Sequence, residues 1–228
     1  MPHERSVFDG AIQVAGVIDR AEAELLVACG VEWLGFPLRL DVHAEDLSDA
    51  DAAAIVRALP PRVRAVLITY LPDADAIHAL AAALGVAAVQ LHGPVARPEI
   101  ARLRALAPDL LVIKSLVVRP DNTDALVDAV AELAPDVDAF ITDTYDPATG
   151  ASGATGRTHD WTVSARLVEI SPRPVILAGG LTPRNVAAAV ARVRPAGVDV
   201  HTGVEGPDGR KRRDLVEEFV AAARATLA

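Results

Sequence analysis

Several residue types are scarce in this chain, and each scarcity excludes a class of protein. Cys29 is the only cysteine among 228 residues, which excludes an internal disulfide and a cysteine-based zinc cluster. No stretch approaches about 18 apolar residues without a charge, so we expect no membrane-spanning segment. The first ten residues, MPHERSVFDG, lack the apolar centre of a secretory signal. These features predict a cytoplasmic protein.

Positive charge is also scarce. The formal net charge is -9, which argues against nucleic acid or an anionic membrane surface as a partner. Lys114 and Lys211 are the only lysines among 22 basic residues. Because arginine is the usual basic residue of this chain, the two lysines are more informative about local structure than the arginines are.

The core must be aliphatic, because apolar residues make up 51% of the chain and aromatic residues only 4%. Eight short apolar runs predict strands, and their near-continuous apolarity is typical of strands buried on both faces. The runs are 11–16, 32–36, 64–70, 87–93, 110–116, 138–144, 174–180 and 197–203.

Segments with the apolar spacing of amphipathic helices separate these runs. Ser48, Asp73 or Asp75, and Thr182 followed by Pro183 are typical residues for helix starts. Eight strand–helix units in a chain of this length predict a single (β/α)8 TIM barrel, one α/β domain over residues 1–228. A doubly wound open sheet is the alternative, but the AGVIDR segment after the first strand is not the GxGxxG turn of such folds.

Catalytic groups of TIM barrels lie at the carboxyl ends of the strands. Two of these ends carry glycine, at Gly179–Gly180 and at Thr202–Gly203. Glycine lets backbone N–H groups approach an anion closely, and phosphate sites of such barrels use the last two strand ends. The sequence therefore predicts a site for one phosphate group, although tight turns without a ligand would also use glycine.

Five segments together resemble the phosphoribosylanthranilate isomerase family of tryptophan biosynthesis. They are VQLHG (89–93), FITD (140–143), GATGRTHDW (153–161), VILAGGLTPRNV (175–186) and VDVHTGVEGPDGRK (198–211). The resemblance implies an Amadori rearrangement of a phosphoribosylated amine without metal or organic cofactor. It implies that Asp143 protonates the furanose ring oxygen, that a base then removes the C2 proton, and that Gly156 belongs to the phosphate-binding set.

The chain departs from the family at the base. The family ends its first strand with a lysine-x-cysteine-glycine pattern, whose thiolate is the base, whereas this chain has Gln13-Val14-Ala15-Gly16. Ala15 cannot accept a proton. His201 and His159 are alternatives, because histidine titrates near neutrality. Lys114 ends a strand and could neutralise a substrate anion, act on Asp143, or form a Schiff base.

A second departure follows the second strand. The family has a longer loop there, with a Ser-Pro-Arg motif that binds the anthranilate carboxylate, and Arg39 is the nearby arginine of this chain. Gln90 and His92 are expected to line the substrate site from the fourth strand. The spacing of Asp41, His43 and Asp46 matches no metal-ligand motif, so no metal site is predicted.

These features support three functions. The first is a phosphosugar-type isomerase with an altered general base, an aldose–ketose isomerase acting on a small phosphorylated substrate as a monomer or homodimer. The alternative is a sister TIM-barrel enzyme, a lyase, aldolase or other isomerase, with a different monophosphorylated substrate. The third is a non-catalytic binder of phosphorylated metabolites, which the replacement at Ala15 alone supports. The retained Asp143 and glycine loops favour the isomerase.

Overall fold

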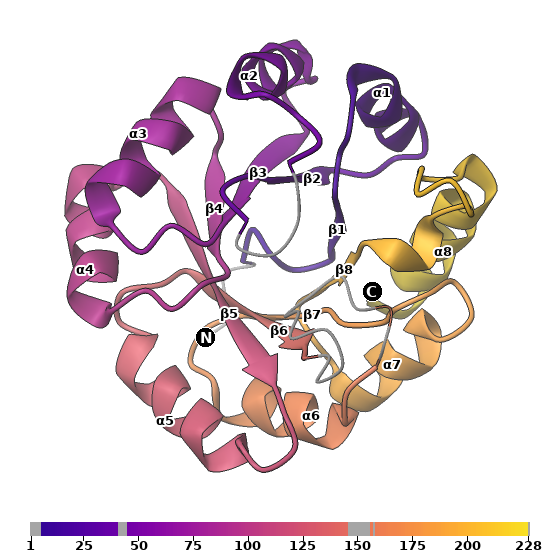
Figure 1. Ribbon diagram of the computed structural model, residues 1–228. Helices are drawn as coiled ribbons and strands as arrows, with labels where there is room; N and C mark the ends of the chain where they lie inside the picture. Colours follow the sequence, from indigo (N-terminus) through magenta and orange to yellow (C-terminus); the bar gives the residue numbers. More distant parts are fainter. Residues whose placement is uncertain (1–5, 41–44, 146–155, 157, 228) are drawn as a thin grey trace.

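In a computed structural model of the protein, eight parallel strands close into a barrel and a helix follows each strand (Figure 1). The structure describes residues 6–40, 45–145, 156 and 158–227. The predicted (β/α)8 barrel is confirmed. The strands are β1 (Ala11–Ala15), β2 (Trp33–Pro37), β3 (Arg64–Thr69), β4 (Ala88–Leu91), β5 (Leu111–Val118), β6 (Ala139–Thr144), β7 (Val175–Leu177) and β8 (Gly197–Val200).

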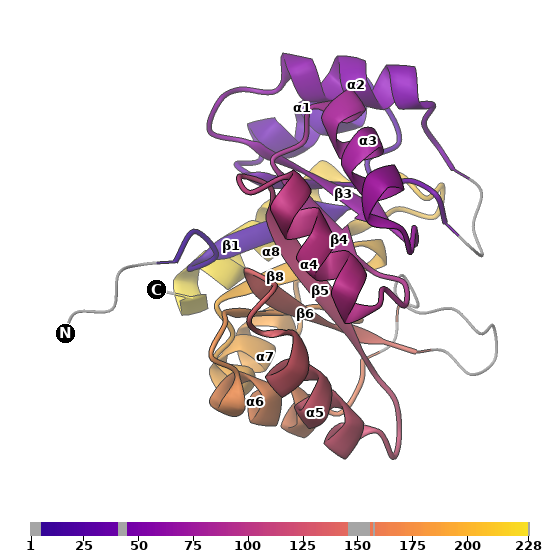
Figure 2. The same ribbon diagram turned by 90° about the vertical axis from the view of Figure 1, so that its left-hand side faces the viewer.

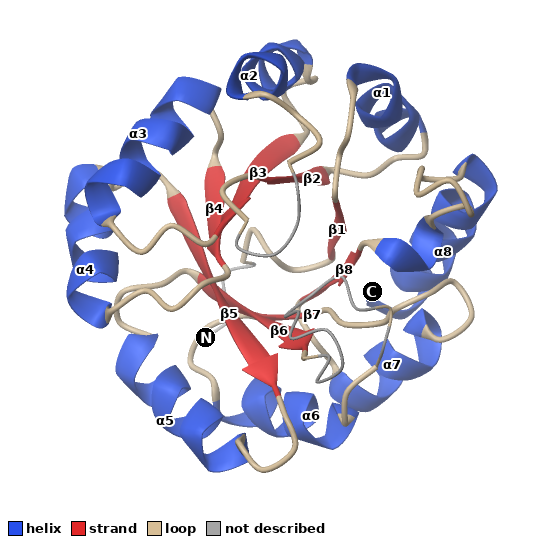
Figure 3. Ribbon diagram, viewed as in Figure 1, coloured by secondary structure: helices blue, strands red, loops and turns tan. Residues whose placement is uncertain are grey.

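The helices form the outer ring, which surrounds the strands in Figure 3. They are α1 (Arg20–Ala28), α2 (Asp49–Ala58), α3 (Ala74–Leu84), α4 (Arg97–Leu106), α5 (Thr123–Leu133), α6 (Trp161–Ile170), α7 (Val186–Val193) and α8 (Arg213–Leu227), with the short 3-10 helix η1 (Thr202–Val204). None of them, within the described ranges, is long and apolar enough to cross a membrane.

All eight apolar runs form strands, and the differences lie at their ends. β5 continues two residues past the predicted end, to Val118, while β7 and β8 end before their glycine motifs. Gly179–Gly180 and Thr202–Gly203 therefore lie in the loops that follow the strands. Figure 2 shows the barrel from the side, with the arrow of β6 pointing to the end where these loops gather.

Strand alternation separates two apolar regions. Ile113 of β5 belongs to the small cluster inside the barrel, whereas its neighbour Val112 belongs to the large cluster between strands and helices. Because successive side chains of a strand point to opposite faces, Ser115 follows Ile113 inward and Lys114 follows Val112 outward. Each polar residue near a strand end is thereby assigned to the interior or to the helix layer.

Aromatic side chains close the amino-terminal end of the barrel. Phe8 and Trp33 stack with ring centroids 5.3 Å apart, and both are buried. The guanidinium of Arg64 lies 5.2 Å from the centre of the Trp33 ring, within the range of a cation–π contact. The carboxyl end is therefore the side on which a ligand meets the interior.

The helix starts follow capping chemistry, with one correction. Ser48 accepts a hydrogen bond from the N–H of Asp51, and Asp73 caps α3 in the same way. The predicted start at Thr182 is wrong, because α7 begins at Val186 after Asn185. The Asn185 side chain accepts from the Thr182 N–H and donates to the Gly180 carbonyl. The Thr182 carbonyl accepts the N–H groups of Asn185 and Val186, so a turn from Thr182 leads into the helix.

We expect Gly197→Ala to destabilise the barrel where it closes. A Cβ added at Gly197 would lie 2.6 Å from the Ala11 carbonyl oxygen and 2.9 Å from the Ala11 Cβ across the β1–β8 pair. Such overpacking costs about 1–3 kcal/mol. Urea unfolding measures this loss. An unchanged free energy of unfolding would show that the two strands separate there without cost.

Candidate active site

Polar side chains converge inside the barrel, near its carboxyl-terminal end. Gln13 of β1, Gln90 of β4, Ser115 of β5, Asp143 of β6 and Asp199 of β8 are all buried. By strand alternation each belongs to the inward-facing set. Below them the interior is apolar, with residues such as Ile113 and Ile141. Among the described residues, the polar part of this interior therefore faces the end where substrates bind in TIM barrels.

A chain of polar contacts connects four of these strands. Gln13 Nε2 donates to Gln90 Oε1 at 3.0 Å, and Gln90 Nε2 donates to Ser115 Oγ at 3.4 Å. Ser115 Oγ lies 3.1 Å from His92 Nδ1, which lies 3.9 Å from Asp143 Oδ2. The structure thus brings Gln90 and His92, both expected to line the substrate site, into one network with Asp143.

Asp143 ends β6 with a buried carboxyl group. Its Oδ1 accepts the Thr144 N–H at 2.7 Å. Burial raises the pKa of this carboxyl above its usual value, while the neighbouring His92 and the Thr144 N–H act in the opposite direction. A carboxyl group with a raised pKa can hold a proton near neutrality and deliver it to a substrate.

Asp199 is a second buried carboxyl group, and the sequence reasoning missed it. Its Oδ1 has no hydrogen-bond partner in the part of the chain that the structure describes. Burial first, and then the charge of Asp143, raise the pKa of Asp199 to about 7, against smaller opposing effects of Gln13 and Lys211. A signal was available, because Asp199 lies two residues before His201 and so shares its face of the strand.

His201 lies beside the end of β1, where this chain has Ala15. A Cβ added at Gly16 would be 2.1 Å from His201 Nε2, so the imidazole covers the residue that follows Ala15. His201 Nε2 is 3.3 Å from Glu205 Oε1. The ring therefore lies at the mouth of the barrel, between β1 and the turn after β8.

The turn after β8 is fixed by one of the two lysines. Lys211 is buried, and its Nζ lies 2.5 Å from Glu205 Oε1. The backbone N–H of Lys211 donates to Glu22 Oε1 at 2.8 Å, and Glu22 Oε2 accepts the Ile18 N–H at 3.2 Å. These bonds join the turn that carries His201 to the start of α1.

The other lysine, Lys114, fixes the end of β4. Its Nζ donates to the carbonyl oxygens of Leu91 and Gly93, each at 3.0 Å, and of Ser115 at 3.1 Å. Burial lowers the pKa of Lys114 to about 8. The predicted strand-end position is wrong, because β5 continues to Val118 and Lys114 lies in its middle. The side chain faces the helix layer, and its hydrogen-bond partners are backbone carbonyls instead of Asp143.

Five residues of the predicted phosphate set lie where three loops meet. Gly179 and Gly180 have φ values of 93° and 63°, in the left-handed region that favours glycine. A Cβ at Gly203 would lie 1.8 Å from the Leu181 carbonyl oxygen, and one at Gly156 would lie 3.6 Å from Thr202 Oγ1. The loops after β6, β7 and β8 thus approach one another through Gly156, Gly179, Gly180, Thr202 and Gly203. Residues 153–155 and 157 of the GATGRTHDW segment lie outside the described residues.

His159 is held by two hydroxyl groups. Its Nδ1 lies 3.0 Å from Thr144 Oγ1 and its Nε2 lies 2.6 Å from Ser164 Oγ. Burial lowers the pKa of His159 to about 4, so the ring is neutral at physiological pH. With both nitrogens bound to hydroxyl groups, His159 connects Thr144, the neighbour of Asp143, to α6.

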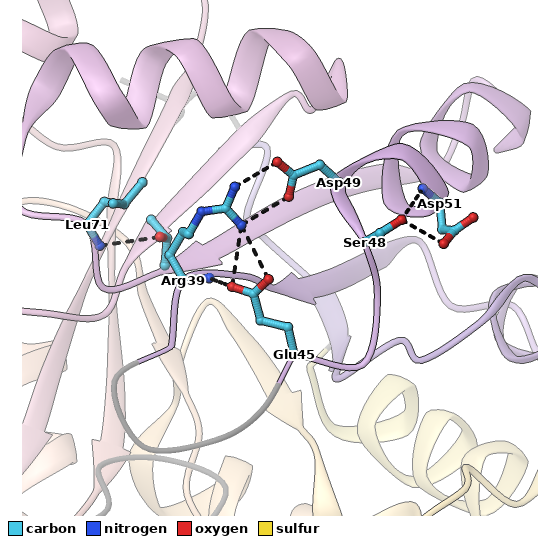
Figure 4. A network of polar contacts seen from close by, with 7 residues as sticks. Arg39, Glu45, Ser48, Asp49, Asp51 and Leu71 are labelled. Carbon is cyan, nitrogen blue, oxygen red and sulfur yellow. Dashed lines mark hydrogen bonds and ion pairs between the residues drawn. The ribbon is translucent and has the colours of Figure 1, made fainter.

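Arg39 meets two carboxylates (Figure 4). Its guanidinium donates to both carboxylate oxygens of Asp49, at 3.0 and 2.7 Å, and lies 3.3 Å from Glu45 Oε2. The hydrogen bond to Asp49 chiefly raises the pKa of Arg39. Asp41 and His43 lie outside the described residues. Within the described ranges, no group of three or more His, Cys, Asp or Glu could hold a metal ion.

Known proteins share both the sequence and the fold. The family model of N-(5'-phosphoribosyl)anthranilate isomerase matches residues 20–222. N-(5'-phosphoribosyl)anthranilate isomerase 2 of Methanosarcina mazei is 38% identical over 215 residues, 93% of each chain. The isomerase of Haloferax volcanii is 37% identical and covers 93% of this chain and 92% of its own.

Solved structures agree with this relationship. The crystal structure of phosphoribosylanthranilate isomerase from Thermotoga maritima superimposes with a TM-score of 0.79 at 28% identity, over 94% of this chain and 98% of that one. Thiamine phosphate pyrophosphorylase from Pyrococcus furiosus, with a TM-score of 0.70 at 15% identity, shares the fold alone. The matched residues and the barrel geometry together show that this chain belongs to the phosphoribosylanthranilate isomerase family.

Proposed function

We propose that this protein catalyses the Amadori rearrangement of N-(5'-phosphoribosyl)anthranilate, with Asp143 as the general acid. The observation that carries the proposal is the buried carboxyl group of Asp143, whose pKa is raised by burial, at the carboxyl end of the barrel. Related enzymes of the family are isomerases of this substrate by name. A crystal structure of one family member contains reduced 1-(o-carboxyphenylamino)-1-deoxyribulose 5-phosphate. That protein is 26% identical to this chain and superimposes with a TM-score of 0.77.

The first step requires a proton on Asp143. Protonation of the furanose ring oxygen breaks its bond to C1 and leaves an iminium ion, because the anilino nitrogen supplies the electron pair. Asp143 is then ionised. His92, 3.9 Å from Asp143 Oδ2, and the Thr144 N–H stabilise this charge. The same contacts therefore favour proton release at the moment when the ring opens.

The glycine loops support the phosphate end of the substrate. A phosphate group on the loops after β6, β7 and β8 would meet backbone N–H groups of Gly179, Gly180 and Gly203, and the hydroxyl of Thr202. Glycine at these positions leaves the N–H groups accessible.

Lys114 is assigned a positioning role. Its ammonium holds the Leu91 and Gly93 carbonyls at the end of β4, on either side of His92. The imidazole Nδ1 of His92 lies 3.9 Å from Asp143 Oδ2. Lys114 thus acts on the acid through the position of His92, and a Schiff base with substrate is not part of the proposal.

One observation favours the second candidate function, a sister enzyme with a different monophosphorylated substrate. The charge of Arg39 is already matched by Asp49 and Glu45. An anthranilate carboxylate would have to compete with both carboxylates for the guanidinium. The substrate preference therefore depends on whether Arg39 exchanges these partners for the ligand.

The monomeric or homodimeric state of the protein stays a prediction.

Asp143→Asn should lower kcat by about 10² to 10⁴, because the amide cannot deliver a proton to the ring oxygen. The measurement is the decay of phosphoribosylanthranilate fluorescence, with substrate generated in place. Asp138→Asn, at the opposite end of β6, is the matched control and should keep its rate. Near-normal turnover of Asp143→Asn would exclude Asp143 as the acid, and wild-type protein without turnover would favour the sister enzyme.

Thr202→Val should weaken phosphate binding. The substitution keeps the shape of the side chain and removes one hydroxyl donor, and a hydrogen bond to a charged group contributes about 1.5–3 kcal/mol, roughly tenfold or more in Kd. Calorimetric titration with inorganic phosphate measures the effect. Arg39→Gln should leave phosphate affinity unchanged. Equal affinity of wild type and Thr202→Val would remove Thr202 from the phosphate site.

A further inference from the structure

We propose that the carboxylate of Asp199 is the general base that removes the C2 proton, in place of the thiolate that residue 15 of this chain cannot supply. The inference rests on the proposed isomerase function and extends it to a residue that carried no prediction. Three features of the structure carry it: the direction of the side chain, its unpartnered oxygen, and its relation to Asp143.

Asp199 faces the interior beside the end of β1. It lies opposite Gln13 in the β1–β8 register, and Ala15 is two residues further along the same inward face of β1. Asp199 and Ala15 thus border the same part of the interior from neighbouring strands. Since Ala15 ends in a methyl group, a substrate carbon over β1 would meet the carboxylate from β8.

The Asp199 carboxyl group has an unused acceptor. Asp199 is 8% exposed, and its Oδ1 is buried without a hydrogen-bond partner among the residues described. A buried polar atom without a partner costs about 1–3 kcal/mol. A protein retains such an atom where a ligand supplies the partner or where the group reacts.

The surroundings keep Asp199 free of a direct counter-charge. Gln13 of β1 is neutral, and Ile176 of β7 and Ala178, which follows this strand, are apolar. The charged groups that act on Asp199 are Asp143 of β6 and Lys211 of the following turn. Lys211 Nζ is itself 2.5 Å from Glu205. Burial and Asp143 therefore dominate, and the pKa of Asp199 is raised to about 7.

The two carboxyl groups form an acid–base pair. Burial raises the pKa of both Asp143 and Asp199, and ionisation of one opposes ionisation of the other. Such a pair retains one proton near neutrality. The productive form has this proton on Asp143 and the negative charge on Asp199, so that a donor and an acceptor are present together.

The proposed step is balanced in protons and electrons. After ring opening, Asp199 forms an O–H bond with the C2 proton, and the C2–H electron pair forms the C1=C2 bond. The iminium π electrons return to nitrogen, which gives a neutral enaminol. Transfer of a proton from the C2 hydroxyl to C1 produces the 1-amino-ketose. Asp199 then carries the proton and Asp143 the charge, and return of the proton to Asp143 restores the enzyme.

His201 is the competing base, and its contacts give it another role. Its Nε2 faces Glu205 at 3.3 Å, in the turn above Gly16. Glu205 is also the partner of Lys211, so His201 belongs to the ion-pair cluster that fixes the turn. Asp199 instead lies on the inner wall below this turn.

Asp199→Asn tests the base directly. We expect kcat for phosphoribosylanthranilate to fall by about 10² to 10⁴, while KM changes by less than about threefold because the amide keeps the shape of the side chain. His201→Asn should retain most of kcat, and Asp138→Asn is the control for loss of a distant carboxylate. Loss of kcat in His201→Asn with retention in Asp199→Asn would overturn the proposal.

Gln13→Lys tests the role of Asp199 through the pH dependence of kcat/KM. This dependence would not change if Asp199 had only a structural role. An ammonium opposite Asp199 should lower the pKa of its carboxyl group by about one unit or more. Because the base must be ionised, activity is lost as pH falls through this pKa. The acidic limb of the kcat/KM profile should therefore move to lower pH in Gln13→Lys. It should not do so in Gln13→Met, which adds no charge and removes a hydrogen bond that lowers the pKa of Asp199. An unmoved limb in Gln13→Lys would contradict the assignment.

A measurement without substrate separates this inference from the proposed function. Carbon-13 NMR of the aspartate carboxyl groups should show one resonance that titrates near pH 7 in the wild type and disappears in Asp199→Asn. If wild-type protein fails to turn over phosphoribosylanthranilate, the isomerase proposal fails, and this resonance would still support an acid–base pair for another substrate. Titration of Asp199 near its ordinary pKa would overturn the pair.

Discussion

The two-residue alternation of side chains in a closed parallel barrel is the constraint on which the site depends. It directs Asp143 and Asp199 into the same barrel interior, where both are buried, although 55 residues separate their positions along the chain. It directs Lys114 away from them. Desolvation then acts on both carboxyl groups at once. The raised pKa values of both carboxyl groups thus follow from the alternation of side chains along the strands, and no single loop has to produce them.

A second group of interactions holds the mouth of the barrel in register. Lys114 binds the carbonyls at the end of β4, and the Glu22–Lys211–Glu205 contacts join the turn after β8 to α1. In both sets a buried lysine ammonium binds acceptor oxygens. Removing one partner is costly, because the other partner would stay buried without it. These contacts therefore hold the strand ends and the turn next to Asp143 and the glycine loops.

Much of the fold could be predicted from the sequence, because eight apolar runs and their helical spacers repeat one unit. The start of α7 could not, since Thr182 and Pro183 have the composition of a helix start while the Asn185 side chain holds a turn there. Asp143 and the glycine loops were singled out through their motifs, and the structure shows that Asp143 is buried near the end of β6. Asp199 lies within the VDVHTGVEGPDGRK segment but was missed, because its burial near Asp143 exists only after the barrel closes. The pairing of Arg39 with Asp49 likewise depends on the path of a loop.

The burial of Lys114 and Lys211 has a consequence for the chemistry of the whole surface. They are the only lysines of the chain, and their exposed fractions are 8% and 4%. The folded protein therefore presents no accessible lysine amine to an acylating reagent. Acylation of either lysine requires local opening of the segment that it holds. The acylation rate of Lys114 therefore measures opening at the end of β4, and that of Lys211 measures opening of the turn after β8. No engineered probe is needed.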